Sequence, residues 1–338
     1  MHVSVRNVKK QYTVMIMTDD LIIVSNSEIQ TFKRCKRKWW LSYYRKLVPI
    51  REEVTGVRSV GTRVHAVIAQ WYTLQAQGME VDLYTEGYGP LWLHDELVEE
   101  DVIKRPDLEQ ELRKEADLSR AMVEGYFEWL EESGADEGIT PVAVEEEVTQ
   151  EVITPVTKTL VEIRAKLDLR VKYEGAEAEP EDMFFDHKSV AEFTTPTKVL
   201  HLDEQMLLYD WLLRWKHEFV SGAIYNMIRR VKRTRAAKPP FFERMTIHHS
   251  KQQLRSFHFR LMGELEDMIR VREALDNGVD PFSVVYPTPN KNCHWDCPFF
   301  DVCGLIDRPE DDPDHYLALI FEEGDPYARY KDLQGVVE

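Results

Sequence analysis

The sequence predicts an α/β (α+β) fold in which a mixed β-sheet is flanked by helices. Residues 160–173 alternate between apolar and polar side chains, and a second strand pattern follows at 183–189. Helical patterns stand on both sides of this pair, near 62–77 and 203–219.

The alternating segment 160–173 is the clearest strand in the sequence. Its apolar positions are Val161, Ile163, Ala165, Leu167, Leu169 and Val171, and its polar positions are Glu162, Arg164, Lys166, Asp168, Arg170 and Lys172. This period of two is that of a strand with one buried face. The acidic segment at 175–182 contains Gly and Pro, which predicts a turn into the strand at 183–189.

Two carboxylates and one lysine would meet on this hairpin. Asp186 and Lys188 are two residues apart, so both side chains leave the same face of their strand. With Asp168 they form a place to hold Mg²⁺ or Mn²⁺, which prefer oxygen ligands. A neighbouring lysine can orient or deprotonate an attacking water. On the hairpin alone, a solvated ion pair between Asp168 and Lys188 is the simpler alternative.

The elements before this hairpin are mostly helical. A cap near residues 25–28 predicts a helix of aromatic and basic residues, which either stacks DNA bases or packs its aromatics into the core. A second helix at 62–77 contains His65, and such a histidine is more often a core residue than a ligand. Residues 80–140 form an insertion with a long amphipathic helix near 107–132, and nothing in it indicates chemistry.

The remaining segments complete the sheet and its helices. They are a strand at 141–154 with acids at Glu145, Glu146 and Glu147, a helix at 203–219 with Gln205 and Tyr209 on one face, a strand at 222–230 and a polar helix near 250–275. The acidic segment beyond about residue 307 is typical of surface wrapping or partial disorder.

The net charge of −17 argues against a general nucleic-acid coat protein. A nuclease stays open, because the local field at the groove decides phosphate contact. Two segments are locally basic, although each is also explained as a solvated face. They contain Lys33, Arg34, Lys36, Arg37, Lys38, Arg45 and Lys46, and then Arg229, Arg230, Lys232, Arg233, Arg235 and Lys238.

No apolar run approaches the roughly 20 residues of a membrane span. The first residues also lack a long apolar region with a cleavage site, so a secretory signal is not expected. We therefore expect a cytoplasmic protein without a membrane partner.

The four cysteines are Cys35 and a C-terminal group, Cys293, Cys297 and Cys303. In a reducing compartment a disulfide framework is not expected. Four thiolates can ligate one metal centre. The paired C-x2-C knuckles of zinc sites are absent, whereas an iron–sulfur cluster tolerates irregular spacing. Composition alone does not choose iron over zinc, and free buried cysteines are the weaker alternative.

In this order the motifs resemble the PD-(D/E)XK nuclease superfamily, in its RecB/Cas4-like branch with a four-cysteine iron–sulfur cluster. The resemblance spans roughly residues 25–303, with the insertion outside it. The matching residues are Ser25, Asn26 and Ser27 with Phe32 and Cys35, Gly61 with His65, Asp168, Asp186-His187-Lys188 with Ser189, Gln205 with Tyr209, and the C-terminal cysteines. Two positions depart: Ala165 replaces the glycine of G-x-x-D, and three residues separate Cys293 from Cys297 where two are usual.

The resemblance implies a metal-dependent catalytic site. His65, Asp168 and Asp186 would bind Mg²⁺ or Mn²⁺, together with the backbone carbonyl of His187. Lys188 would position the nucleophilic water and stabilise the transition state.

Further implied roles concern DNA and the ends of the chain. Gln205 and Tyr209 would contact DNA or support the site. The basic segments offer four more candidate DNA contacts: Arg37, Lys38, Arg230 and Lys232. A [4Fe–4S] cluster on Cys35, Cys293, Cys297 and Cys303 would join both ends of the chain, so a structural role is expected.

The predicted organisation is an N-terminal extension at 1–20, one nuclease domain at 21–303 and an acidic tail at 304–338. The expected function is a metal-dependent exonuclease that hydrolyses phosphodiester bonds at single-stranded or duplex DNA ends. Its context would be recombination, repair or phage DNA processing in a bacterial or phage-infected cell, with a helicase or recombination partner. The alternatives are a catalytically silent DNA-binding scaffold and a site-specific endonuclease.

Overall fold

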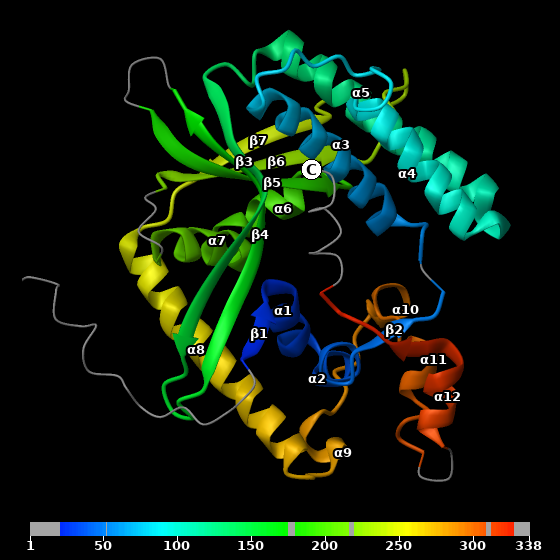
Figure 1. Ribbon diagram of the computed structural model, residues 1–338, viewed down its shortest axis with the longest axis vertical. Helices are drawn as coiled ribbons and strands as arrows, with labels where there is room; N and C mark the ends of the chain where they lie inside the picture. The colour runs from blue at the N-terminus through cyan, green and yellow to red at the C-terminus, as the bar shows by residue number, and fades with distance from the viewer. Residues whose placement is uncertain (1–20, 52, 175–179, 216–219, 309–311, 328–338) are drawn as a thin grey trace, which may run out of the picture.

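The computed structural model describes residues 21–51, 53–174, 180–215, 220–308 and 312–327, so the expected N-terminal extension lies outside the described residues. Within these ranges six strands form one mixed sheet, which confirms the predicted fold class (Figure 1). The strands are β1 (Ile22–Ser25), β3 (Ile139–Ile153), β4 (Leu160–Tyr173), β5 (Glu181–Val190), β6 (Gly222–Arg229) and β7 (Phe242–Ile247).

The long strand β4 is the centre of this sheet. One edge of β4 pairs with antiparallel β3, and the other pairs first with parallel β1 and then with antiparallel β5. β5 is followed by parallel β6 and antiparallel β7. The β1 pairing ends at Arg164 and the β5 pairing ends at Leu169. Asp168 therefore lies in the gap between the β1 pairing and the β5 pairing, on the edge of β4 that faces away from β3.

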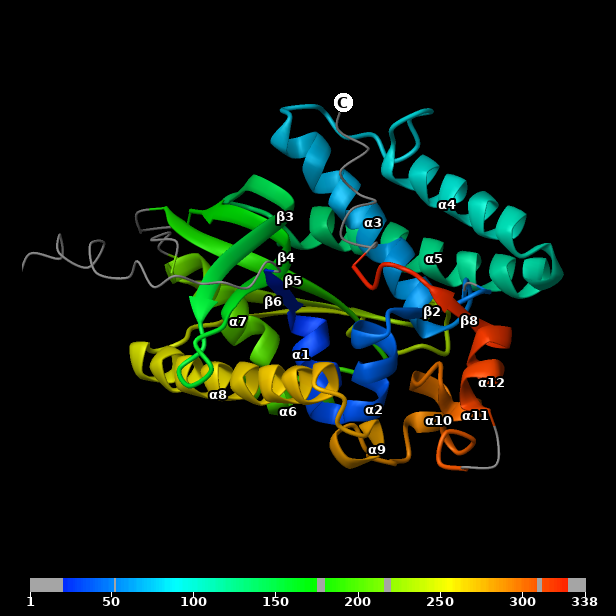
Figure 2. The same ribbon diagram turned by 60° about the horizontal axis from the view of Figure 1, so that its bottom comes forward.

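Helices cover both faces of the sheet (Figures 1 and 2). On one face lie α3 (Val57–Ala76) and α5 (Glu109–Ser133), with α4 (Pro90–Lys104) packed against both, and on the other lie α1 (Asn26–Arg34), α7 (Glu204–Trp215) and α8 (Lys251–Asp276). Phe184 and Phe185 are fully buried in opposite cores, because neighbouring residues of a strand point to opposite faces. None of the described helices combines the length and apolar character needed to cross a membrane.

The helix starts follow local capping chemistry. Ser25 Oγ accepts a 3.2 Å hydrogen bond from the Glu28 N–H, as the predicted cap of α1 requires. α3 begins at Val57, after Gly56 at a φ of 96°, so it starts earlier than expected and contains Gly61. The expected end of α7, at 216–219, lies outside the described residues.

The insertion is part of the core rather than an appendage. His94 Nε2 lies 2.8 Å from Ser119 Oγ, and His94 Nδ1 lies 3.1 Å from Asp95 Oδ1. Ser119 is fully buried, so this Ser–His–Asp arrangement joins α4 to α5 and offers a substrate no access.

Segments from the first and last parts of the described chain meet in a small subdomain. Its strands, β2 (Leu47–Pro49) and β8 (Phe321–Glu323), pair antiparallel. Its short helices are α2 (Lys36–Trp39), α9 (Pro281–Val284), α10 (Cys293–Asp296), α11 (Phe300–Cys303) and α12 (Pro313–Ile320). Where the sequence suggests a surface tail, the structure has a helix and a strand, because Leu317 and Phe321 are buried against Leu41 and Phe299.

Candidate active site

The predicted catalytic residues converge where β4 and β5 separate. The ladder between these strands ends at the pair Leu169–Phe185. Beyond it the Asp168 carboxylate replaces a backbone partner, and its Oδ2 accepts a 2.7 Å hydrogen bond from the His187 N–H. Asp168 thereby faces Asp186, close enough that the charge of Asp168 raises the pKa of Asp186.

Lys188 is held between β5 and α7. Its Nζ donates to Asp186 Oδ1 at 2.9 Å and to Gln205 Oε1 at 3.0 Å. Gln205 Nε2 in turn donates to Tyr209 Oη at 2.6 Å. The Q-x-x-x-Y face of α7 thus supports Lys188, and the hydrogen bonds of Lys188 go to Asp186 and Gln205 rather than across the strands to Asp168.

α3 brings His65 to the same place. His65 Nδ1 lies 3.6 Å from Asp168 Oδ2. Gly61, one turn earlier, permits this approach, since a Cβ at that position would lie 3.2 Å from Ser189 Oγ on β5. The G-x-x-x-H spacing therefore combines a close helix–strand contact with a histidine that points at the carboxylates.

Burial controls the protonation of this cluster. Burial, reinforced by Asp168, raises the pKa of Asp186 to about 6. Burial also raises the pKa of Asp168 and, with the charge of Lys188, lowers the pKa of His65. Burial by itself would lower the pKa of Lys188. The charges of Asp186 and Asp168 have the larger combined effect, so the pKa of this lysine is raised. The lysine is therefore cationic at neutral pH and the imidazole is neutral.

The donor set fits a divalent cation in kind. Asp186 Oδ2 is buried and has no hydrogen-bond partner in the described part of the chain. Such an orphaned acceptor needs a cation or water to offset its burial. Within the described ranges, no three His, Cys, Asp or Glu side chains are already grouped as a metal site. His65, Asp168 and Asp186 would therefore have to close around a bound ion.

Glu145 is a further carboxylate at the site, which the sequence interpretation missed. Its neighbours Val144 and Glu146 pair with Leu169 and Leu167, so Glu145 stands opposite Asp168. Its φ of 52° is unusual for a non-glycine residue in a strand. Burial and the charge of Asp168 raise its pKa, while Lys166 Nζ lies 2.8 Å from its carboxylate. The acidic run at 145–147 was the available signal, but only the strand register shows which acid faces Asp168.

The model of the PD-(D/E)XK nuclease superfamily matches residues 23–304. The chain belongs to this superfamily. Among curated proteins none matches. Two solved structures are similar over most of their length: SSO0001, at 13% identity, 87% coverage of this chain and 88% of that chain, with a TM-score of 0.35; and a candidate exonuclease from Eubacterium rectale, at 12% identity, 87% and 91% coverage, with a TM-score of 0.47. Neither likeness is strong enough to assign a substrate to this nuclease-superfamily member.

The second basic segment lies beside the site. Arg230 follows β6, and its guanidinium donates to Ser189, the residue just after the D-x-K motif. It bonds the backbone carbonyl of Ser189 and, at 3.4 Å, its Oγ. Burial alone lowers the pKa of Arg230. Lys232 is about half exposed and lies 3.4 Å from Asp117. These two candidate DNA contacts thus follow the C-terminal end of β6, next to the strand that carries Lys188.

Two cations of the first basic segment, Arg37 and Lys38, form ion pairs within the protein. Arg37 is 3% exposed, and its guanidinium bonds both carboxylate oxygens of Asp307, at 2.7 and 2.9 Å. Lys38 Nζ lies 3.2 Å from Asp296 Oδ2. Both cations therefore pair with acids from the C-terminal part of the chain, and their expected role as DNA contacts stays a prediction. Trp39 is fully buried, which favours core packing over base stacking.

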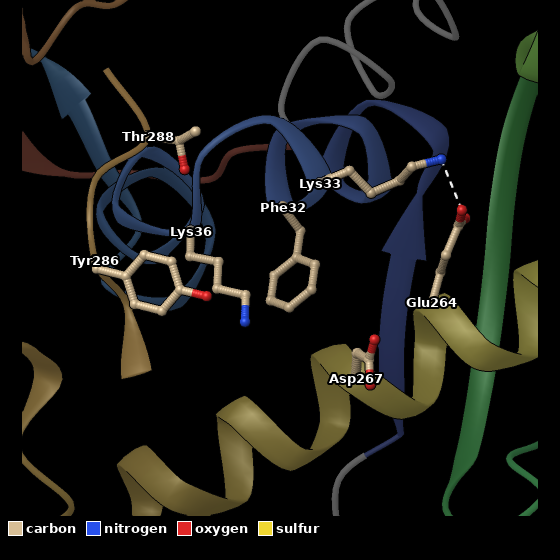
Figure 3. A pocket seen from close by; sticks show the side chains of 7 residues that line it. All are labelled: Phe32, Lys33, Lys36, Glu264, Asp267, Tyr286 and Thr288. Carbon is tan, nitrogen blue, oxygen red and sulfur yellow. Dashed lines mark ion pairs between the residues drawn. The ribbon is translucent and has the colours of Figure 1, made fainter. Parts of the chain in front are cut away.

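A small cavity of about 280 Å³ lies beside the end of α1 and the start of α2 (Figure 3). The Lys36 ammonium lies over the rings of Phe32 and Tyr286, 5.3 and 5.2 Å from their centroids. Lys33 turns away and pairs with Glu264 at 2.6 Å. Lys33 and Lys36 are thus both engaged within the protein.

The four cysteines are free, and within the described residues they are not grouped as a metal site. Burial raises the pKa of both Cys297 and Cys303, and the nearby charge of Cys35 raises each further. The Thr288 N–H donates to Cys35 Sγ at 3.5 Å, and the Asn290 N–H donates to Cys293 Sγ at 3.3 Å. Backbone donors of this kind suit thiolate ligands of a metal cluster.

Proposed function

We propose that this chain is a Mg²⁺- or Mn²⁺-dependent deoxyribonuclease that hydrolyses phosphodiester bonds as an exonuclease at DNA ends. One observation carries the proposal. Asp186 Oδ2 is buried without a partner in the described ranges, beside Asp168 and a charged Lys188. Superfamily membership supports a nucleic acid as the substrate.

Each site residue has a role in this proposal. His65, Asp168 and Asp186 hold the cation with the His187 carbonyl. When bound, the cation would acidify a water and polarise the scissile phosphate. Because its pKa is raised, Lys188 orients the water and balances phosphate charge rather than taking up a proton.

The preference for DNA ends follows the RecB/Cas4-like resemblance. The same resemblance suggests work in recombination, repair or phage DNA processing, in the cytoplasm of a bacterial or infected cell and beside a helicase. A silent DNA-binding scaffold is disfavoured because Asp168, Asp186 and Lys188 are all present and grouped. A site-specific endonuclease on this fold remains the enzymatic alternative.

We also propose that Cys35, Cys293, Cys297 and Cys303 hold a [4Fe–4S] cluster of structural function. The approach of Cys35 to Cys297 and Cys303, and the backbone donors to sulfur, support it. The cluster would join α1 to the C-terminal subdomain.

Cleavage of end-labelled linear DNA and of closed circular DNA tests the proposed function. The protein is purified without oxygen and assayed with Mn²⁺ or Mg²⁺, next to Lys188→Ala and Lys172→Ala, whose lysine pairs with Asp182 on the exposed hairpin. We expect the wild type and Lys172→Ala to degrade linear DNA and to leave closed circular DNA intact. We expect the rate of cleavage by Lys188→Ala to be lower by about a hundredfold or more. Cleavage of closed circular DNA at fixed positions would indicate a site-specific endonuclease. Retardation of DNA on a gel without any cleavage would indicate a catalytically silent DNA-binding scaffold.

A further inference from the structure

We propose that the insertion holds the catalytic strand in place through a buried chain of hydrogen bonds that ends on His187. The inference rests on the proposed function, since it concerns how the metal site is positioned. His187 stands between Asp186 and Lys188, so its side chain points to the opposite face of β5, toward α3 and α5. The Tyr72 ring of α3 stacks on the His187 ring, 6.0 Å away and 8° from parallel.

The His187 peptide needs this support because its ladder with β4 has ended. Its N–H donates to Asp168, and its carbonyl is the proposed backbone ligand. A small rotation of this one peptide would move the ligand and disturb the Asp168 carboxylate together. Pairing with β6 constrains only one side of β5 here, so the His187 side chain provides the second anchor.

Asn226 on β6 makes that anchor. It is fully buried, and its Nδ2 lies 2.7 Å from His187 Nδ1 and 2.9 Å from Tyr126 Oη of α5. Its Oδ1 accepts a 3.1 Å hydrogen bond from Arg244 Nε on β7. The amide therefore uses both hydrogens and its oxygen within one network.

Arg244 determines which way this amide faces. A guanidinium can only donate, so Asn226 must turn its oxygen to Arg244 and its NH₂ to His187. His187 Nδ1 is then an acceptor, which places the ring proton on Nε2, a buried atom without a hydrogen-bond partner in the described part of the chain. One arginine thus sets the orientation of the amide and, through it, the tautomer of the histidine.

The insertion in turn fixes Arg244. Arg244 Nη1 donates to the carbonyl of Ala135 at 2.7 Å and lies 2.8 Å from Asp136 Oδ1, and Nη2 donates to Tyr126 Oη at 2.7 Å. Ala135, Asp136 and Tyr126 all belong to the 80–140 segment, which the superfamily motifs leave out. We therefore assign Tyr126, Arg244 and Asn226 as positioning residues for the metal site.

The test compares Tyr126→Phe and Asn226→Leu with Ser119→Ala. Ser119 supplies an equally buried hydroxyl of the insertion, but it bonds His94 rather than this network. Mn²⁺ affinity is measured by electron paramagnetic resonance of the free ion, and kcat and KM are measured on linear DNA. We expect the two network variants to weaken Mn²⁺ binding by about tenfold and lower kcat, with KM for DNA unchanged. Ser119→Ala should lower only the melting temperature.

The outcomes separate this inference from the proposed function. A wild type that neither binds Mn²⁺ nor cuts DNA would overturn the function and the inference with it. An active wild type whose network variants keep Mn²⁺ affinity and kcat would overturn the inference alone. So would variants whose loss of Mn²⁺ affinity is matched by Ser119→Ala, since that would be a general stability effect. If Asn226→Leu does not fold, Tyr126→Phe, which keeps the aromatic ring, decides.

Discussion

At the scale of single residues, the cations near the site differ in whether an acid already neutralises them. Arg230 bonds the carbonyl and hydroxyl of Ser189, and burial is the only influence that shifts its pKa. Arg233 bonds the Glu128 carboxylate at 2.5 Å. Arg230 therefore keeps a charge that a DNA phosphate can use, whereas most of the charge of Arg233 is offset.

Arg230→Gln should weaken DNA binding in a salt-dependent way. One lost phosphate contact reduces the slope of log Kd against log salt by about 0.7 for single strands or 0.9 for duplex. The slope is measured by fluorescence anisotropy with Ca²⁺ or without divalent metal, so that DNA is not cut. Arg233→Gln serves as the control and should change the slope by less. Equal slopes for wild type and Arg230→Gln would remove Arg230 from the DNA interface.

At the scale of elements, the hairpin and its flanking helices could be predicted because their signals are local. The period of two identified β4, and the spacing of Asp186 and Lys188 placed both on one face. Glu145, Asn226 and Arg244 carry no local signal of this kind. Their roles come from strand register and from contacts between segments far apart in the sequence, which no single-sequence pattern encodes.

The insertion should show an acid-sensitive contribution to stability from His94. Burial lowers the pKa of His94 below its ordinary value of 6.5. The unfolded chain then binds this proton more readily, so the contribution is complete above about pH 6.5 and is lost as pH falls below it. Lowering the pH from about 7 to about 5 should therefore reduce the free energy of unfolding more in the wild type than in His94→Gln. This free energy is measured by chemical denaturation at each pH. Parallel pH dependences for the two proteins would contradict this assignment.

At the scale of the whole molecule, contacts between residues far apart in the sequence join the first and last parts of the described chain. Glu28 accepts from Trp39 Nε1 at 2.9 Å and from Arg272 at 2.7 Å, and it also bonds the Tyr327 hydroxyl. The acidic composition after residue 307 concealed this order, because the buried Leu317 and Phe321 are few among many charges.

Loss of one cysteine should loosen this closure. If the four cysteines hold an iron–sulfur cluster, Cys297→Ala lowers the iron content and the melting temperature together, because the cluster links residues distant in sequence. Both quantities are measured on protein purified without oxygen. Phe300→Ala, at a position 48% exposed in the same segment, is the matched control and should retain its iron. Full iron content and an unchanged melting temperature in Cys297→Ala would exclude the cluster from a structural role.

The central claim is that Asp186 helps to hold a divalent cation that hydrolysis of DNA requires. The most direct measurement is nucleotide release from linear DNA as Mn²⁺ is titrated, for wild type and Asp186→Asn. We predict that the rate of nucleotide release by the wild type rises with Mn²⁺ and saturates. In Asp186→Asn we predict that this rate falls by at least about a hundredfold, because several kcal/mol of transition-state stabilisation depend on the bound ion. Release that needs no divalent metal, or that persists at the wild-type rate in Asp186→Asn, would contradict the claim.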